Sequence, residues 1–75
     1  MKTLVYEEII DFLEEFKESN KKKTVLKIAE NYFNFTTTKL QEFNYIINDV
    51  IYQYNCFVFY IEKKGGIKKW IYQIF

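Results

Sequence analysis

Apolar side chains recur with a helical period over the first part of the chain. Across residues 3–18 they return at intervals of three and four positions, which is the spacing of one helix face. This face comprises Val5, Ile9, Phe12, Leu13 and Phe16. Thr3 is a suitable N-cap, and Glu7 and Glu8 fall in the electropositive first turns. The pattern therefore predicts a helix over residues 3–18, with an acidic stripe opposite its apolar face.

Two further helices are predicted after a Lys-rich loop at residues 19–23. The first covers roughly Val25 to Phe33, and residues 34–37 form a turn. The second begins after Thr38, because Thr38 and Gln41 have the spacing of a capping box, and it runs to about Tyr54. Its apolar stripe is Leu40, Phe43, Ile47, Val50, Ile51 and Tyr54. Asn55 would end it, because Asn tolerates the left-handed conformation.

The last twenty residues, 56–75, predict a β-hairpin. Aromatic and β-branched residues favour strands, and Gly65-Gly66 suits a two-residue turn. This register pairs Ile61 with Trp70 and gathers one aromatic face, which we expect to cover the helices. The face comprises Phe57, Phe59, Ile61, Trp70, Tyr72 and Ile74. The expected fold is therefore α+β, a single domain over residues 1–75 with three helices followed by a C-terminal β-hairpin.

Charge is small overall but unevenly distributed. The net charge is +1, yet residues 1–20 carry −4 and residues 21–75 carry +5. All eleven basic residues are Lys. The frequent Lys, Ile, Asn, Tyr and Phe are typical of an AT-rich genome, so we expect a viral or mobile-element source.

Composition excludes most catalytic chemistry. The chain has no His, so it cannot form a His-based triad, acid–base pair or metal site, and we expect no enzyme activity, no metal and no cofactor. The one cysteine, Cys56, cannot form an internal disulfide and fits a reducing compartment. No apolar run approaches the roughly 18–20 residues of a membrane span, and no signal peptide is recognised. A cytoplasmic location without membrane contact is expected.

The order of helices, four-residue turn, longer helix and hairpin resembles a winged helix-turn-helix domain. Residues 25–33 match the first helix of the motif, residues 34–37 its turn, residues 38–54 the recognition helix and residues 56–75 the wing. The resemblance implies binding of double-stranded DNA, with the start of the recognition helix in the major groove and the wing on the backbone. The positions that match DNA-contacting ones are Lys21, Lys22, Lys23, Thr36, Thr37, Thr38, Lys39, Gln41, Tyr45, Lys63, Lys64, Lys68 and Lys69.

The resemblance thus predicts a small transcriptional regulator. Proteins of this size usually act as homodimers, because one half-site gives too little affinity. The acidic helix and the second hairpin face are candidate dimer surfaces, since Tyr60, Ile71 and Phe75 make the latter more apolar than solvent requires. An alternative stays open: a protein-interaction module, such as an inhibitor or adaptor, that uses the acidic helix or the hairpin face.

Overall fold

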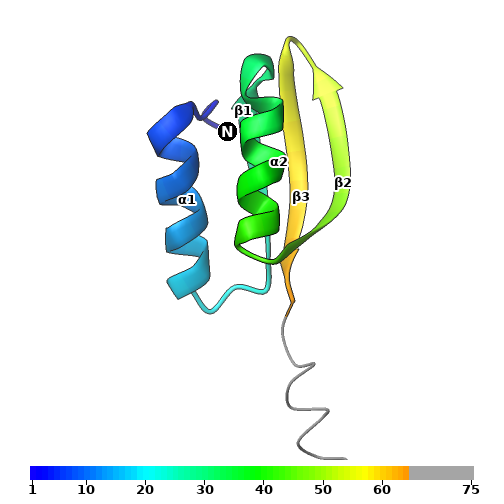
Figure 1. Ribbon diagram of the computed structural model, residues 1–75. Helices are drawn as coiled ribbons and strands as arrows, with labels where there is room; N and C mark the ends of the chain where they lie inside the picture. Colours follow the sequence, from blue (N-terminus) through cyan, green and yellow to red (C-terminus); the bar gives the residue numbers. More distant parts are fainter. Residues whose placement is uncertain (65–75) are drawn as a thin grey trace, which may run out of the picture.

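The computed structural model describes residues 1–64, and it has two layers (Figure 1). A three-stranded antiparallel sheet forms one layer, and two α-helices on the same face of the sheet form the other. The elements in chain order are α1 (Tyr6–Glu18), β1 (Lys23–Ala29), the short 3-10 helix η1 (Glu30–Tyr32), α2 (Phe33–Glu42), β2 (Tyr45–Gln53) and β3 (Cys56–Lys63). The prediction of three helices followed by a C-terminal hairpin is therefore wrong.

The first helix matches the sequence pattern. Ile9, Leu13 and Phe16 are its buried residues, as their spacing predicts. The helix begins later than predicted, because Val5 and not Thr3 is the N-cap residue. The side chain of Glu8 accepts a hydrogen bond from the Val5 backbone N–H at 3.2 Å, so it satisfies a donor at this helix end.

Residues 23–29 form strand β1 and not the predicted second helix. Leu26 and Ile28 are buried, whereas Val25 and Lys27, which alternate with them, project to the other side of the sheet. This is the alternation of a strand, and β-branched Thr24, Val25 and Ile28 favour it. The N-terminal segment adds to the outer edge of this strand, because the Leu4 N–H donates to the Lys27 carbonyl at 2.8 Å.

The predicted recognition helix over residues 38–54 is also wrong. Residues 34–37, the predicted turn, lie inside α2, and this helix ends at Glu42. Asn44 then takes a left-handed conformation (φ 62°), which stops the helix and redirects the chain into β2. Without a helix over 38–54, the chain contains no helix-turn-helix of the expected kind in its described part.

The hairpin of this fold joins β2 to β3. Its two-residue turn is Tyr54-Asn55, and both residues have positive φ (53° and 60°), as a type I′ turn requires. The predicted strand at residues 57–62 is present as β3, but the prediction of its partner strand is wrong, because β3 pairs with β1 and β2. Strand β3 lies in the centre of the order β1-β3-β2, so both of its edges are occupied. Gly65, Gly66 and the predicted second strand lie outside the described residues.

The core lies between the helices and one face of the sheet. Its buried side chains come from α1, α2 and all three strands: Ile9, Leu13, Phe16, Leu26, Ile28, Leu40, Tyr45, Phe59 and Ile61. Phe59 and Ile61 face this core, as the alternation in β3 predicts. The Phe33 ring packs against Phe57 and Phe59 at centroid distances of 4.5 and 5.7 Å, which fastens the start of α2 to the central strand.

Candidate functional site

Two residues predicted to contact DNA, Thr36 and Tyr45, are instead part of the buried interior. Thr36 is fully buried, on the side of α2 that faces the sheet. Tyr45 is also buried, and its hydroxyl donates a hydrogen bond to the Leu13 carbonyl at 3.0 Å. Burial, with a smaller contribution from the negative charge of Glu18, raises the pKa of Tyr45 above its ordinary value. Neither side chain can reach a DNA groove while the core is intact.

The other predicted groove residues lie along α2. The Thr37 hydroxyl donates to the Asn34 carbonyl at 3.0 Å, so it makes a local bond within the helix. Lys39 pairs with Glu42 at 3.0 Å, and its ammonium lies 5.7 Å from the Phe35 ring centroid. Thr38 and Gln41 are exposed. These residues do not form the predicted reading surface, because the helix that was to present them ends at Glu42.

Lys63 fastens the end of β3 to the end of α1. Its Nζ donates to the Ser19 carbonyl at 2.6 Å and to the Lys17 carbonyl at 3.4 Å. The same ammonium lies 4.8 Å from the centroid of the Phe16 ring. The carbonyls of the last helical turn and of the C-cap residue carry partial negative charge and lack helical partners, so a cation stabilises them. Lys63 therefore has a structural role in this position.

Two clusters of lysines that were predicted to contact DNA, one at residues 21–23 and one at residues 63–64, lie at the same end of the molecule. The loop with Lys21 and Lys22 precedes β1, and Lys64 follows β3 directly. The Lys63 backbone N–H donates to the Lys22 carbonyl at 2.9 Å, so these two segments run side by side. Lys23 is exposed at the same end of the sheet. Lys68 and Lys69, the remaining predicted wing residues, lie outside the described residues.

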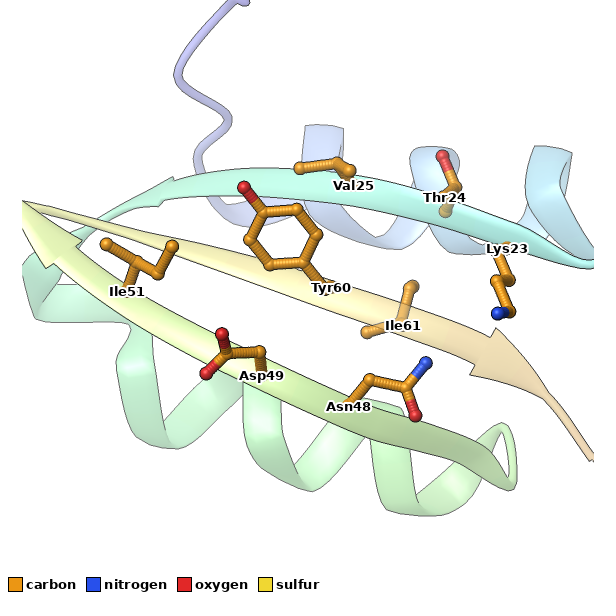
Figure 2. A pocket seen from close by; sticks show the side chains of 8 residues that line it. All are labelled: Lys23, Thr24, Val25, Asn48, Asp49, Ile51, Tyr60 and Ile61. Carbon is orange, nitrogen blue, oxygen red and sulfur yellow. The ribbon is translucent and has the colours of Figure 1, made fainter.

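The sheet has a second face, which neither helix covers (Figure 2). Alternation sends every second residue of each strand to this side, which we call the open face. The strand register arranges these residues in three rows across β1, β3 and β2: Lys23–Glu62–Ile46, Val25–Tyr60–Asp49 and Lys27–Val58–Ile51. The open face thus has apolar side chains around Tyr60, Val58 and Ile51, with Lys23 and Lys27 on β1, Glu62 at one end of β3 and Asp49 on β2.

The Tyr60 ring lies at the centre of the open face. Figure 2 shows it between Val25 of β1 and the side chains of Ile51 and Asp49 on β2. The ring is 38% exposed and Ile51 is 41% exposed, although both are large apolar groups on regular strands. Together with Lys23, Thr24, Asn48 and Ile61, these residues line a shallow hollow of about 530 Å³. A hollow of this size can receive several side chains of a partner.

The outer edge of β2 is also exposed, but it is protected against strand addition. The register shifts between Ile47 and Asp49, so Asn48 forms a bulge. The Asp49 carboxylate accepts a hydrogen bond from the Val50 N–H at 2.8 Å, which occupies one of the edge donors. Bulges and charged side chains are common devices that keep an edge strand from pairing with another chain.

Sequence reasoning found the open face only in part. It placed Tyr60 on the second face of a hairpin, but it put Val25 and Ile51 on helices. The signal that could have joined them is the run Lys23–Ala29, whose β-branched residues and Leu26–Lys27–Ile28 alternation fit a strand as well as a helix.

The described part of the chain offers little reactive chemistry. Within residues 1–64, no group of three or more His, Cys, Asp or Glu side chains is placed to hold a metal ion. Cys56 is half-buried, with its sulfur 3.8 Å from the Thr3 hydroxyl. The Tyr52 hydroxyl donates to the Glu30 carboxylate at 2.6 Å, and this bond raises the pKa of Tyr52 above its ordinary value. The pair joins β2 to η1 at the surface.

Among residues 1–64, no helix is both long enough and apolar enough to cross a membrane. Comparison of the chain with models of protein families, with curated proteins and with solved structures finds no match in any of the three.

Proposed function

We propose that this protein is a protein-interaction module that binds its partner on the open face of the sheet. The observation that carries the proposal is the apolar group of Val25, Tyr60 and Ile51, bordered by Asp49, at the centre of a sheet face that neither α1 nor α2 covers. Apolar patches of this kind, rimmed by polar residues, mark interaction sites in soluble domains. An aromatic side chain at the centre of such a patch is also the residue type that most often dominates binding energy.

The test compares two Tyr→Lys variants of a tagged full-length chain in co-purification experiments. Tyr60→Lys places a charge at the centre of the open face, whereas Tyr54→Lys makes the same change at the hairpin turn, where the side chain is 86% exposed. We expect Tyr60→Lys to lose a partner that the wild type and Tyr54→Lys retain, with circular dichroism showing that both variants fold. Retention of every partner by Tyr60→Lys would refute the open face as the binding surface.

The same experiment addresses the acidic stripe of α1. Glu14 and Glu18 are exposed on this helix, and the alternative interaction surface predicted from sequence depends on them. Charge reversal at both positions should leave the partner bound if the open face is the docking surface. Loss of the partner only in this double variant would move the binding site to α1.

A second candidate function, binding of a nucleic-acid backbone, is favoured by the adjoining lysines at one end of the molecule. Lys21, Lys22, Lys23 and Lys64 are exposed there, and exposed ammonium groups gathered in one region can contact phosphates. This candidate does not depend on a recognition helix, so it implies binding with little sequence preference.

Fluorescence anisotropy with a labelled DNA duplex tests this second candidate. Binding should appear at low salt and weaken as salt rises, and Lys22→Glu with Lys64→Glu should weaken it further. Lys27→Glu is the control for each of these substitutions made singly, because it makes the same charge change on the open face, four residues along β1 from Lys23. No binding even at low salt would remove this candidate.

A further inference from the structure

The open face has an ordered distribution of charge. Its lysines, Lys23 and Lys27, are both on β1, and its acidic group Asp49 is on β2. The strand order β1-β3-β2 places these two strands on either side of β3, which contributes Tyr60 and Val58 to the centre of the face. One margin of the face is therefore positive and the other is negative.

Such a face is complementary to itself in one orientation. A two-fold axis parallel to the strands, passing over β3, lays β1 of one copy across β2 of the other. Asp49 then falls between the rows of Lys23 and Lys27 of the second copy, each about 7 Å away along the strand, which is within reach of a lysine side chain. The two Tyr60 rings meet near the axis, in the row that each shares with Val25 and Asp49.

The other simple orientation is unfavourable. A two-fold axis that lies in the plane of the interface but runs across the strands would place β1 over β1 and reverse the order of the rows. Lys23 of one copy would then face Lys27 of the other, and like charges at close range oppose association. The charge pattern therefore selects the parallel axis.

Among the described residues, Glu62 is the remaining charged group on the open face, and because it lies on β3 close to the proposed axis, the two copies bring their Glu62 carboxylates opposite each other. Its carboxylate already accepts a hydrogen bond from the Asn48 amide at 3.1 Å, and Lys23 is its partner across the strands in the same copy. Its charge is thus partly compensated within each copy, at one end of the face and away from the Tyr60 row.

We propose that the occupant of the open face is a second copy of this chain, packed sheet against sheet about a two-fold axis parallel to the strands. This inference rests on the proposed function, because it names the partner of that same surface. The protected edge of β2 favours packing through the face over extension of the sheet. The two sheets would lie about 10 Å apart, the usual separation of aligned packed sheets. Because the same patch is used by both copies, the assembly closes as a dimer.

Sedimentation equilibrium of the purified full chain gives the solution mass and the dissociation constant of the dimer. Concentrations up to roughly 1 mM are used, so that weak association is also detected. We expect a dimer. Tyr60→Lys should weaken it about tenfold or more, because a charge at the centre of a desolvated patch removes its main apolar contact. Tyr54→Lys, the matched control at the exposed turn, should leave the dissociation constant unchanged.

A charge swap tests the orientation. Asp49→Lys alone and Lys27→Asp alone should each weaken the dimer several-fold, because each places like charges together across the interface. The double variant should recover most of the wild-type dissociation constant, because the swapped charges again face one another. Thermal melts of each single variant show whether the fold itself is intact, in particular after loss of the Asp49–Val50 hydrogen bond.

The outcomes separate this inference from the proposed function. A monomer at all concentrations, or a dimer that Tyr60→Lys leaves intact, refutes the second copy as occupant. If the chain is monomeric while Tyr60→Lys still loses a different protein partner, the open face remains the interaction surface and the inference of self-association alone fails. A dimer that the double charge swap does not restore would contradict the proposed axis.

Discussion

Tyr54 lies in the turn between β2 and β3, and whether its replacement by glycine raises or lowers the free energy of unfolding depends on the fold. Tyr54 has φ of 53° and its side chain is 86% exposed, so it carries the cost of a left-handed conformation with little packing in return. This conformation costs a non-glycine residue roughly 1–2 kcal/mol, and glycine adopts it freely. Glycine also loses more backbone entropy on folding, by about 0.5–1 kcal/mol. Tyr54→Gly should therefore increase the free energy of unfolding by about 0.5–1 kcal/mol.

The same substitution has the opposite effect if residues 38–54 form a helix. Glycine in the last turn of a helix costs up to about 1 kcal/mol relative to a better helix former. A change of 0.5–1 kcal/mol shifts the melting temperature of a domain this small by roughly 2–8 °C, which circular dichroism resolves. Melting curves and urea titrations of the wild type and Tyr54→Gly thus distinguish a hairpin turn from a helix end.

Gln53→Gly is the matched control for this experiment. Gln53 is the adjacent residue, it is exposed, and it lies in β2 with an ordinary negative φ. Glycine there should lower the free energy of unfolding by about 0.5–1 kcal/mol. A destabilised Tyr54→Gly, or equal effects of the two substitutions, would show that the reasoning about the turn is wrong.

Three further substitutions test the core and one surface contact. Thr36→Val should raise the free energy of unfolding by about 1 kcal/mol in urea titrations, because the buried Thr36 Oγ1 lacks a hydrogen-bond partner in the described chain and Val keeps the shape; a loss of stability would point to a partner for this hydroxyl. Phe59→Ala should cost about 3–5 kcal/mol, against about 1 kcal/mol for Val58→Ala on the opposite face of the same strand, and similar costs would contradict the assigned faces. Glu30→Gln should lower the pKa of Tyr52, seen as a difference between ultraviolet titrations of variant and wild type. Because folding raises the pKa of Tyr52 above 10.0, the stability that the contact adds is present below pH 10 and is lost as pH rises through the pKa of the folded state. Identical titrations of variant and wild type would exclude the contact.

The sequence predicted best where local pattern and tertiary structure agree. Ile9, Leu13 and Phe16 repeat with a helical period and are buried by α1, and Phe59 and Ile61 alternate and are buried by β3. In both segments one period dominates, so the choice of element needs no information from distant residues.

The error over residues 45–53 has a physical cause in the bulge. An uninterrupted strand alternates apolar and polar residues, but the extra residue Asn48 resets this alternation in β2. Ile47, Val50 and Ile51 consequently fall at intervals of three and four, which imitates a helix face. The bulge becomes visible only when β3 is present as a partner, so single-sequence periodicity could not reveal it.

The errors in pairing had a larger effect on the predicted site. The chain offers β3 three possible partners, and Gly65-Gly66 is a stronger turn signal than Tyr54-Asn55, which needs two non-glycine residues at positive φ. Once β3 was paired with the wrong segment, Val25 and Ile51 could not be placed beside Tyr60. The open face is a product of long-range pairing, so only its β3 strip was predictable from local pattern.

The central position of β3 has a consequence for how the protein folds during synthesis. The sheet's middle strand is made last among the described elements, so β1 leaves the ribosome well before its hydrogen-bonding partner. The pairing of Lys23 with Glu62 spans most of the described chain, whereas the β2–β3 hairpin is local and closes within roughly 1–10 μs in an isolated chain. We therefore expect the hairpin to form first and to serve as the template on which β1 and the two helices assemble, with Leu26 and Ile28 exposed to chaperones until that moment.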